Sequence, residues 1–373
     1  MAEKGLEGVV ATTSSICSVD GLEGRLTYRG IDIRILAEKS TFEEVVYFLW
    51  HAALPTRAQL DELSAQLKAH RELPPPVLAA MRTWPKTANP MEVLRTAVSM
   101  LSFYDPDAAD PSREANTRIA VRLTAQIPTI VAAFHRLRSG QEPIPPDPSL
   151  THAANFLYML TGERPSPTAE RVFDICLILH ADHELNASTF AARVTVATLS
   201  DMYSGIVSAI GTLKGPLHGG ANTAVMKMLL KIGDLDKVEG AIKEMLANKQ
   251  RIPGFGHRVY KTWDPRAMWL RRIAEELGRS TGNLKWYQMS RKAEEVVWQE
   301  KQLYPNLDFY SASVYYTLGI PPDLFTPIFA ISRISGWTAH ILEQLADNRL
   351  IRPRAEYVGP VDQPYIPLEQ RTG

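Results

Sequence analysis

Cysteine is nearly absent from the sequence, and the two cysteines present lie far apart. Cys17 and Cys176 form neither a CxxC pair nor a disulfide framework in a chain of 373 residues. Disulfide-rich secreted proteins depend on such frameworks. The pattern therefore predicts a protein of the reducing cytoplasm.

Long apolar runs are also missing. No stretch of about 18 apolar residues occurs, which is the length that a membrane-spanning helix needs. The first residues contain two acidic side chains, Glu3 and Glu7, and no apolar signal core. We therefore expect neither a membrane span nor secretion.

Neither sign of charge is in excess. Lys and Arg together number 41, as do Asp and Glu, so the formal net charge is zero. Binding to nucleic acid or to an anionic membrane needs a basic field, which this balance does not supply. It suits a chain that holds a small ligand with a few placed charges.

Most of the chain has apolar residues at helical spacing. In "STFEEVVYFLWHAAL", Ser40 or Thr41 is expected to cap a helix, with Glu43 or Glu44 completing a capping box. The pattern repeats along the chain and predicts a mostly α-helical protein. Because 373 residues exceed what one hydrophobic core holds, we expect two domains.

A second helix start is marked by "DPRAMWLRRIAEELG". Asp264 is expected as the N-cap and Pro265 as the first helical residue, and Gly278 is expected just past the end.

Strand signals are confined to the N-terminal region. Two short β-prone runs flank Asp20-Gly21 and predict a small hairpin. Breaks rich in Gly, Pro and polar residues follow at 141–151, 214–222 and 305–322, and the last two are expected near domain edges. The proline-containing tail 359–373 is expected to lie extended over a surface.

Functional-looking polar groups interrupt the helical pattern in four segments. These are "LHADHELNAST" (179–189), "GPLHGGAN" (215–222), "RIPGFGHRVYKTWDPRA" (251–267) and "YPNLDFYSASVYY" (304–316). Each residue also has a plain structural interpretation, such as a turn histidine, a capping aspartate or a surface arginine.

His180 and His183 are spaced i and i+3, which is compatible with metal ligation. The spacing HxxHE matches neither HExxH nor HxxEH, and a third ligand would have to be assumed. A metal-dependent hydrolase that uses these two histidines therefore remains one possible function. A helical scaffold without enzymatic activity is another.

The same local sequence pattern occurs twice, at His218 and His257. Both histidines lie beside glycines at breaks between helices, where a ligand can approach the backbone closely. Two such histidines, the carboxylate of Asp308 and several arginines suit proton transfer on an anionic substrate.

These segments together resemble the citrate synthase family. "HADHELNAST", "GPLHGGAN", "PGFGHRVYKTWDPRA", "DFYSASVYY", "SRISGWTAHILEQ" and "RPRAEYVGP" resemble its signature motifs in order and spacing, and "GRLTYRGIDI" resembles the opening of its shorter, prokaryotic-type members. One departure is Leu185-Asn186, where some members have a glycine pair. The resemblance runs from about Gly5 to Pro367.

The resemblance implies an all-α homodimer with two domains per subunit and an active site between them. By motif position, residues 1–218 and 320–373 are expected to form the large, dimer-forming domain. Residues 219–319 are expected to form the small domain, which closes over the site.

The family reaction condenses acetyl-CoA with oxaloacetate and water to give citrate and CoA, at the entry to the tricarboxylic acid cycle. By resemblance, Asp308 is the base that removes a methyl proton, and His218, as a neutral ring, donates a hydrogen bond to the enolate oxygen. His257 is expected to hydrogen-bond the carbonyl oxygen of oxaloacetate.

Oxaloacetate has two carboxylates, which guanidinium groups match well. The family's arginines correspond to Arg266, Arg333 and Arg352, the last supplied by the partner subunit, and His183 is also expected to contact oxaloacetate.

The resemblance also implies a CoA site, with acyl-CoA as co-substrate, no permanently bound cofactor and no metal. The expected CoA contacts are the adenine-receiving loop Pro253, Gly254, Phe255 and Gly256, and the nearby cations Lys214, Arg258 and Lys261.

Within the family, 2-methylcitrate synthase, which uses propionyl-CoA, shares every motif quoted above. One methylene in an apolar pocket is worth only about 1–3 kcal/mol, so the choice of acyl-CoA depends on few contacts. Citrate formation is the preferred interpretation, and 2-methylcitrate formation is the alternative.

Overall fold

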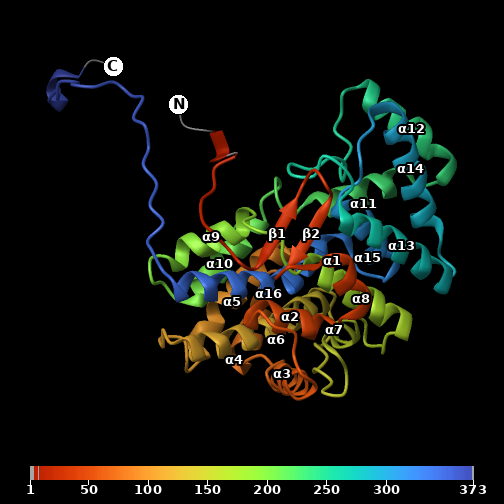
Figure 1. The fold of residues 1–373 in the computed structure, drawn as a ribbon, viewed down its shortest axis with the longest axis horizontal. Helices are drawn as coiled ribbons and strands as arrows, with labels where there is room; N and C mark the ends of the chain where they lie inside the picture. Colours follow the sequence, from red (N-terminus) through yellow and green to blue (C-terminus); the bar gives the residue numbers. More distant parts are fainter. Residues whose placement is uncertain (1–3, 7, 372–373) are drawn as a thin grey trace.

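The computed structural model describes residues 4–6 and 8–371. The prediction that residues 1–3, 7 and 372–373 belong to the large domain lies outside the described residues. The described residues form sixteen α-helices and one small antiparallel sheet (Figure 1). The helices are α1 (Ile33–Lys39), α2 (Phe42–His51), α3 (Arg57–Ala69), α4 (Pro75–Thr83), α5 (Pro90–Leu101), α6 (Arg113–Arg138), α7 (His152–Thr161), α8 (Pro167–His180), α9 (Ala187–Val196), α10 (Met202–Leu213), α11 (Ala221–Ile232), α12 (Val238–Ala247), α13 (Pro265–Ser280), α14 (Lys285–Lys301), α15 (Leu307–Thr317) and α16 (Phe325–Ala346). The expected mostly α-helical fold is confirmed.

The predicted hairpin is present at the N-terminal end. Strand β1 (Cys17–Asp20) pairs with β2 (Arg25–Tyr28), with Cys17 opposite Tyr28. A third strand, β3 (Ile31–Asp32), which the sequence did not predict, pairs with β2.

Local chemistry sets where the helices begin. Thr41, rather than Ser40, caps α2, and the side chain of Glu44 completes the capping box. Asp264 caps α13 by accepting from the backbone N–H of Arg266, as predicted.

The prediction that Gly278 ends α13 was wrong, because the helix continues to Ser280. A Cβ at Gly278 would lie 3.1 Å from the carbonyl oxygen of Asn283, so this glycine lets the following loop fold back against the helix. The reversal itself occurs at Gly282, which has a φ of 69°.

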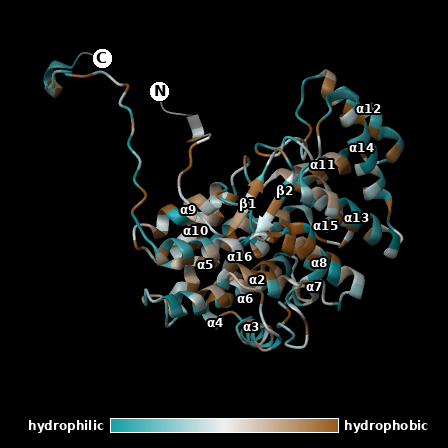
Figure 2. Cartoon of the chain, in the orientation of Figure 1, coloured by the Kyte–Doolittle hydropathy of each residue, from teal (hydrophilic) through white to brown (hydrophobic). Residues whose placement is uncertain are grey.

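Two long helices, α6 and α16, run through the core and contact each other. Helix α16 contacts α2, α6, α8, α9 and α10, and its side chains are buried on nearly every turn. Figure 2 shows the apolar residues concentrated around these inner helices, with hydrophilic residues outside. Burial on nearly every turn, which includes polar residues such as Arg333 and His340, places α16 at the centre of the molecule.

Helices α11 to α15 form a second group at one side of the molecule (Figure 1). In this group α12 contacts α14, and both α11 and α13 contact α15. The predicted small domain, 219–319, spans the same helices, and its boundaries stay a prediction.

Beyond α16 the chain extends away from the helices (Figure 1). Residues 352–371 are exposed throughout, including a short 3-10 helix at Leu368–Gln370. The tail is extended as predicted, but the prediction that it lies over a surface was wrong, because its described residues run away from the helices and are exposed throughout. Of the described helices, none has both the length and the apolar character that crossing a membrane requires.

Candidate active site

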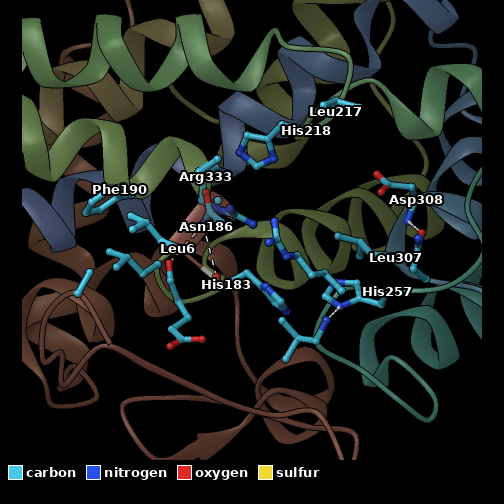
Figure 3. A pocket seen from close by; sticks show the side chains of 18 of the residues that line it. Leu6, His183, Asn186, Phe190, Leu217, His218, His257, Leu307, Asp308 and Arg333 are labelled. Atoms are coloured by element: carbon cyan, nitrogen blue, oxygen red, sulfur yellow. Dashed lines mark hydrogen bonds between the residues drawn. The ribbon is translucent and has the colours of Figure 1, made fainter. Parts of the chain in front are cut away.

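One cavity of about 760 Å³ gathers half of the predicted site residues, including the three predicted catalytic ones (Figure 3). They reach it from four separate segments and from α16. The predicted residues that line it are His183, His218, His257, Arg258, Arg266, Asp308 and Arg333.

His257 is held by the backbone of its own loop. Its Nδ1 accepts hydrogen bonds from the N–H groups of Val259 at 3.0 Å and Tyr260 at 3.1 Å. A neutral ring must then have its proton on Nε2. Burial, with the charge of Arg266, lowers the pKa of His257 to about 4, so the ring is a neutral donor near pH 7.

His218 has the opposite tautomer. Its Nε2 lies 3.3 Å from the backbone N–H of Ser188 and 2.8 Å from the hydroxyl of the same residue. Because a backbone N–H only donates, Nε2 accepts and Nδ1 has the proton. Burial, with the charge of Arg333, lowers the pKa of His218 to about 4.

The glycine after His218 is required by space. A Cβ at Gly219 would lie 2.5 Å from the carbonyl oxygen of Leu213 and 2.8 Å from Thr326 Cγ2. The turn can therefore pack tightly between α10 and α16, which leaves the imidazole as the group that reaches the cavity.

His183 lies next to His257, with ring centroids 5.4 Å apart. Its Nε2 is 3.2 Å from the hydroxyl of Tyr260. Burial, with the charges of Arg266 and His257, lowers the pKa of His183 well below its usual value.

Asp308 lies in the first turn of α15, which is capped by the side chain of Asn306. Its Oδ1 is buried and has no hydrogen-bond partner in the described part of the chain. Burial raises the pKa of Asp308 to about 6, since no partner stabilises the charge directly.

A backbone ladder connects Asp308 to the loop of His257. The N–H of Gly256 bonds to the carbonyl of Tyr304 at 3.0 Å, and the N–H of Asn306 bonds to the carbonyl of Gly254 at 2.9 Å. Asp308 and His257 are therefore fixed by the same pair of segments.

Two buried arginines supply positive charge. Arg266 pairs with Asp264 through Nε at 3.0 Å and through a terminal nitrogen at 2.9 Å. Arg333 donates from Nε to the carbonyl of His180 at 2.7 Å, which leaves its terminal nitrogens available to a carboxylate.

Other predicted residues lie outside this cavity. Arg352 lines an adjoining cavity of about 800 Å³, which shares Leu6, Val9 and Phe190 with the first. Lys214 pairs with Glu92.

The expected CoA loop, 253–256, does not line the cavity, and Phe255 packs against Phe309 with ring centroids 4.5 Å apart. Lys261 donates from Nζ to the carbonyl of Arg258 at 3.4 Å.

Comparison with known proteins assigns the family. The family model described as "Citrate synthase, C-terminal domain" matches residues 5–354. The chain belongs to the citrate synthase family. Citrate synthase 2 of Bacillus subtilis (strain 168) is 54% identical over 371 residues, which are 99% of this chain and 99% of the relative.

Solved citrate synthases have the same fold. The enzyme from Thermotoga maritima MSB8 superimposes with a TM-score of 0.90 at 45% identity, covering 100% of both chains. That from Thermoplasma acidophilum, solved with carboxymethyl coenzyme A and oxaloacetate, gives 0.92 at 34% identity, again covering 100% of both. The expected helical two-domain fold and the acyltransferase class are confirmed.

The similar proteins also include a 2-methylcitrate synthase. 2-Methylcitrate synthase 1 of Corynebacterium glutamicum is 42% identical over 374 residues, 99% of this chain and 98% of the relative. Because the higher identities belong to citrate synthases, citrate synthase activity is the better supported of the two.

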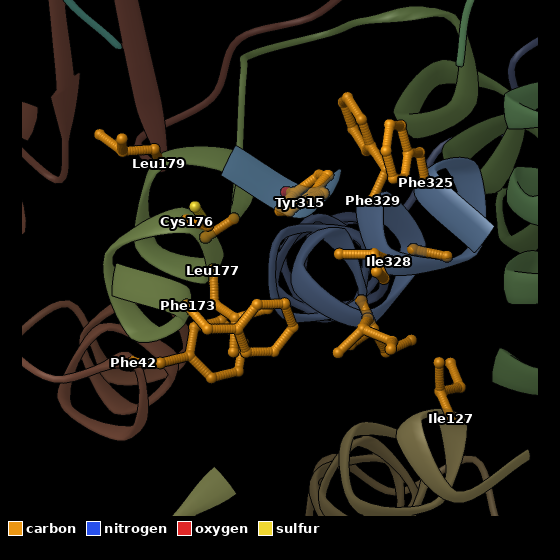
Figure 4. Close-up of a cluster of buried hydrophobic side chains, with 14 of the residues drawn as sticks. Phe42, Ile127, Phe173, Cys176, Leu177, Leu179, Tyr315, Phe325, Ile328 and Phe329 are labelled. Carbon is orange, nitrogen blue, oxygen red and sulfur yellow. The ribbon is translucent and has the colours of Figure 1, made fainter. Parts of the chain in front are cut away.

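Membership of the citrate synthase family replaces the metal-dependent hydrolase alternative. His180 does not line the cavity: it is fully buried, its Nδ1 lies 2.8 Å from the carbonyl oxygen of Cys176, and its ring packs against Phe329 and Tyr315. Figure 4 shows these neighbours within the core around α8 and α16. Among the described residues, no group of three His, Cys, Asp or Glu is placed to hold a metal ion.

Sequence reasoning missed two kinds of site residue in this citrate synthase family member. Ser188 and Tyr260, which bond to His218 and His183, lie inside quoted motifs but have no signal of their own. The N-terminal residues Gly5, Leu6 and Val9 also line the cavity, and nothing in their composition indicates it.

Proposed function

We propose that this cavity condenses acetyl-CoA with oxaloacetate, with Asp308 as the base and His218 and His257 as neutral hydrogen-bond donors. The observation that supports the proposal most is the pair of opposite tautomers. Each histidine uses one nitrogen to accept from the backbone and has its proton on the other, while a buried carboxylate lines the same cavity.

The chemistry follows from these groups. Asp308 removes a proton from the thioester methyl, and the enolate oxygen accepts a hydrogen bond from Nδ1 of His218. The enolate carbon attacks the carbonyl carbon of oxaloacetate, whose oxygen accepts from Nε2 of His257. A new C–C bond forms as the π bond of the carbonyl opens, and the resulting alkoxide oxygen takes the proton from Nε2 of His257. Water then attacks the thioester carbon and the C–S bond breaks, which gives citrate and CoA, while proton exchange with solvent restores Asp308 and His257.

Charge complementarity supports the oxaloacetate site. Arg266 and Arg333 lie in the cavity with His183, and each arginine is already fixed by one protein partner. Preorganised guanidinium groups bind a dicarboxylate with little loss of side-chain freedom.

We infer that a second copy of the chain completes the site by supplying Arg352. In a single chain this arginine is exposed and lines the adjoining cavity, so it is accessible to a partner subunit. We propose that the resulting homodimer acts in the cytoplasm. In each subunit, residues 219–319 close over the bound substrates, which is consistent with their grouping at one side of the molecule.

The proposed CoA contacts begin at the cavity mouth. Arg258 lines the cavity, and Lys261 lies three residues further along the same loop. The loop 253–256 stays the proposed adenine site, whereas Lys214 is engaged by Glu92 and is the weakest candidate.

A thiol-release assay tests the proposal. With oxaloacetate present, CoA release is expected from acetyl-CoA with a kcat/KM at least tenfold above that from propionyl-CoA, in line with the value of one methylene. Release from neither thioester would overturn the proposed function, and a reversed ratio would assign 2-methylcitrate formation instead.

A further inference from the structure

A fully buried carboxylate, Asp182, directly precedes His183 in the chain. Its Oδ2 lies 3.3 Å from Nε2 of His340 and accepts from the backbone N–H of Glu184 at 3.1 Å. Glu184 has a φ of 54°, so the chain reverses at this point. The carboxylate therefore closes the turn from which His183 projects.

The proton between Asp182 and His340 is located by Arg193. A terminal nitrogen of Arg193 lies 3.0 Å from Nδ1 of His340, and a guanidinium has no acceptor. Nδ1 is therefore the acceptor, and the ring proton is on Nε2, facing Asp182. Arg193 is itself fixed by Glu343 at 2.7 Å and Gln344 at 3.1 Å.

Asp182 is closely packed against α16 and hydrogen-bonded to Tyr28. A Cβ at Gly336 of α16 would lie 2.4 Å from Asp182 Oδ1 and 2.3 Å from the carbonyl oxygen of Ala181. On the opposite side, the backbone N–H of Asp182 bonds to the hydroxyl of Tyr28 at 3.1 Å.

We propose that Asp182 and His340 are positioning residues, which fix the turn 182–184 so that His183 meets oxaloacetate. They touch no substrate and act through His183. The same turn leads to Asn186, the N-cap of α9, and to Ser188, which bonds to His218. The proposal rests on the proposed role of His183 in oxaloacetate binding.

The first test removes the carboxylate. Asp182→Ala is expected to weaken oxaloacetate binding at least tenfold, measured by calorimetry, with a smaller change in kcat. Asp182→Asn keeps an oxygen that accepts from His340 and is expected to recover most of the affinity. A folded Asp182→Ala protein that binds oxaloacetate as the wild type does would overturn the proposal.

The second test displaces the carboxylate without removing any polar group. Gly336→Ala forces a methyl group against Asp182 Oδ1 and against the backbone carbonyl oxygen of Ala181, so the turn must shift, and oxaloacetate binding is expected to weaken at least threefold. Gly240→Ala is the matched control, because Gly240 is also helical and its Cβ would meet nothing within 4 Å. This pair keeps the proposal testable if Asp182→Ala does not fold, and equal affinities for the two variants would overturn it.

A double-mutant cycle separates positioning from general loss of structure. In a His183→Ala background, Asp182→Ala is expected to reduce oxaloacetate affinity less than twofold further, since it acts through the missing ring. An undiminished tenfold loss would contradict action through His183. Failure of the wild type to release CoA would instead overturn the proposed function, so the two failures are distinguishable.

Discussion

At the scale of single residues, Asp308 has a buried carboxylate oxygen, Oδ1, that no group in the described part of the chain hydrogen-bonds. Its pKa of about 6 keeps it mostly ionised at pH 7, yet makes it a stronger base than an ordinary carboxylate. The environment thus suits this carboxylate to the proposed proton transfer.

Asp308→Asn is expected to lower kcat by about a thousandfold, because the amide cannot take up a proton and general bases contribute roughly 10²–10⁴. Oxaloacetate binding by calorimetry is expected to stay within about twofold, since other groups hold that substrate. Normal turnover in this variant would show that another residue is the base.

The pH dependence of kcat/KM is expected to have an acid limb near 6. Below that pH Asp308 binds a proton and stops acting as a base, so activity falls as pH decreases. His218 and His257, with pKa values lowered to about 4, stay neutral across this limb. A limb centred near 4, measured in the free enzyme, would contradict the assignment.

The sequence predicted the candidate reactive residues, which the structure brings to one cavity, but it did not predict the residues that support them. His218, His257 and Asp308 were found because their residue types stand out against glycine or aromatic neighbours. Ser188 and Tyr260 could not be found in this way, since each bonds to a histidine from a different segment and only tertiary proximity gives it a role.

At the scale of elements, the pairing of 254–256 with 304–306 determines how α15 meets the His257 loop. Gly254 has a φ of 79°, and a Cβ there would lie 2.7 Å from Val225 and 2.9 Å from Phe309. Both backbone conformation and space therefore require glycine.

Gly254→Ala is expected to destabilise the protein by about 1–3 kcal/mol more than Gly282→Ala, the usual cost of overpacking. Gly282 has a similar φ of 69° but open space at its Cβ position, so the control isolates the clash. Urea unfolding measures the difference. Equal stabilities would mean that the ladder relaxes freely around an added methyl group.

Helix starts were predictable from the sequence, and one helix end was not. Caps such as Thr41 and Asp264 act within a few residues, so local sequence specifies them. Gly278 has the local signature of a helix end. In the structure it lies inside the helix, where the lack of a side chain lets the following loop pack closely against it.

At the scale of the whole molecule, the position of Arg352 outside the cavity makes a strong prediction about assembly. If Arg352 serves the partner's site, a mixed dimer of Asp308→Ala and Arg352→Ala chains contains one site with both wild-type residues. Mixing the two inactive variants is expected to restore up to half of the wild-type activity per mixed dimer, measured by CoA release.

The contradicting outcome is equally clear. If Arg352 acts in its own chain, both sites of the mixed dimer have one defect, and no activity returns on mixing. Chains carrying both substitutions, mixed with wild type, control for subunit exchange.

The length of the chain predicted two domains. The positions of the motifs along the chain predicted which residues belong to each of them. The contribution of Gly5, Leu6, Gly8, Val9 and Ala11 to the cavity was not predictable, because it depends on how an N-terminal segment crosses the folded surface.

The hydrogen bonds of His218 and His257 have a further consequence. Each ring turns its lone pair toward the backbone and presents only an N–H group to the cavity. Borderline divalent ions such as Zn²⁺ or Ni²⁺ bind imidazole through a free nitrogen lone pair, and each lone pair here is already engaged by a backbone N–H group. The geometry that prepares the two rings to donate is therefore expected to disfavour transition-metal binding at either ring.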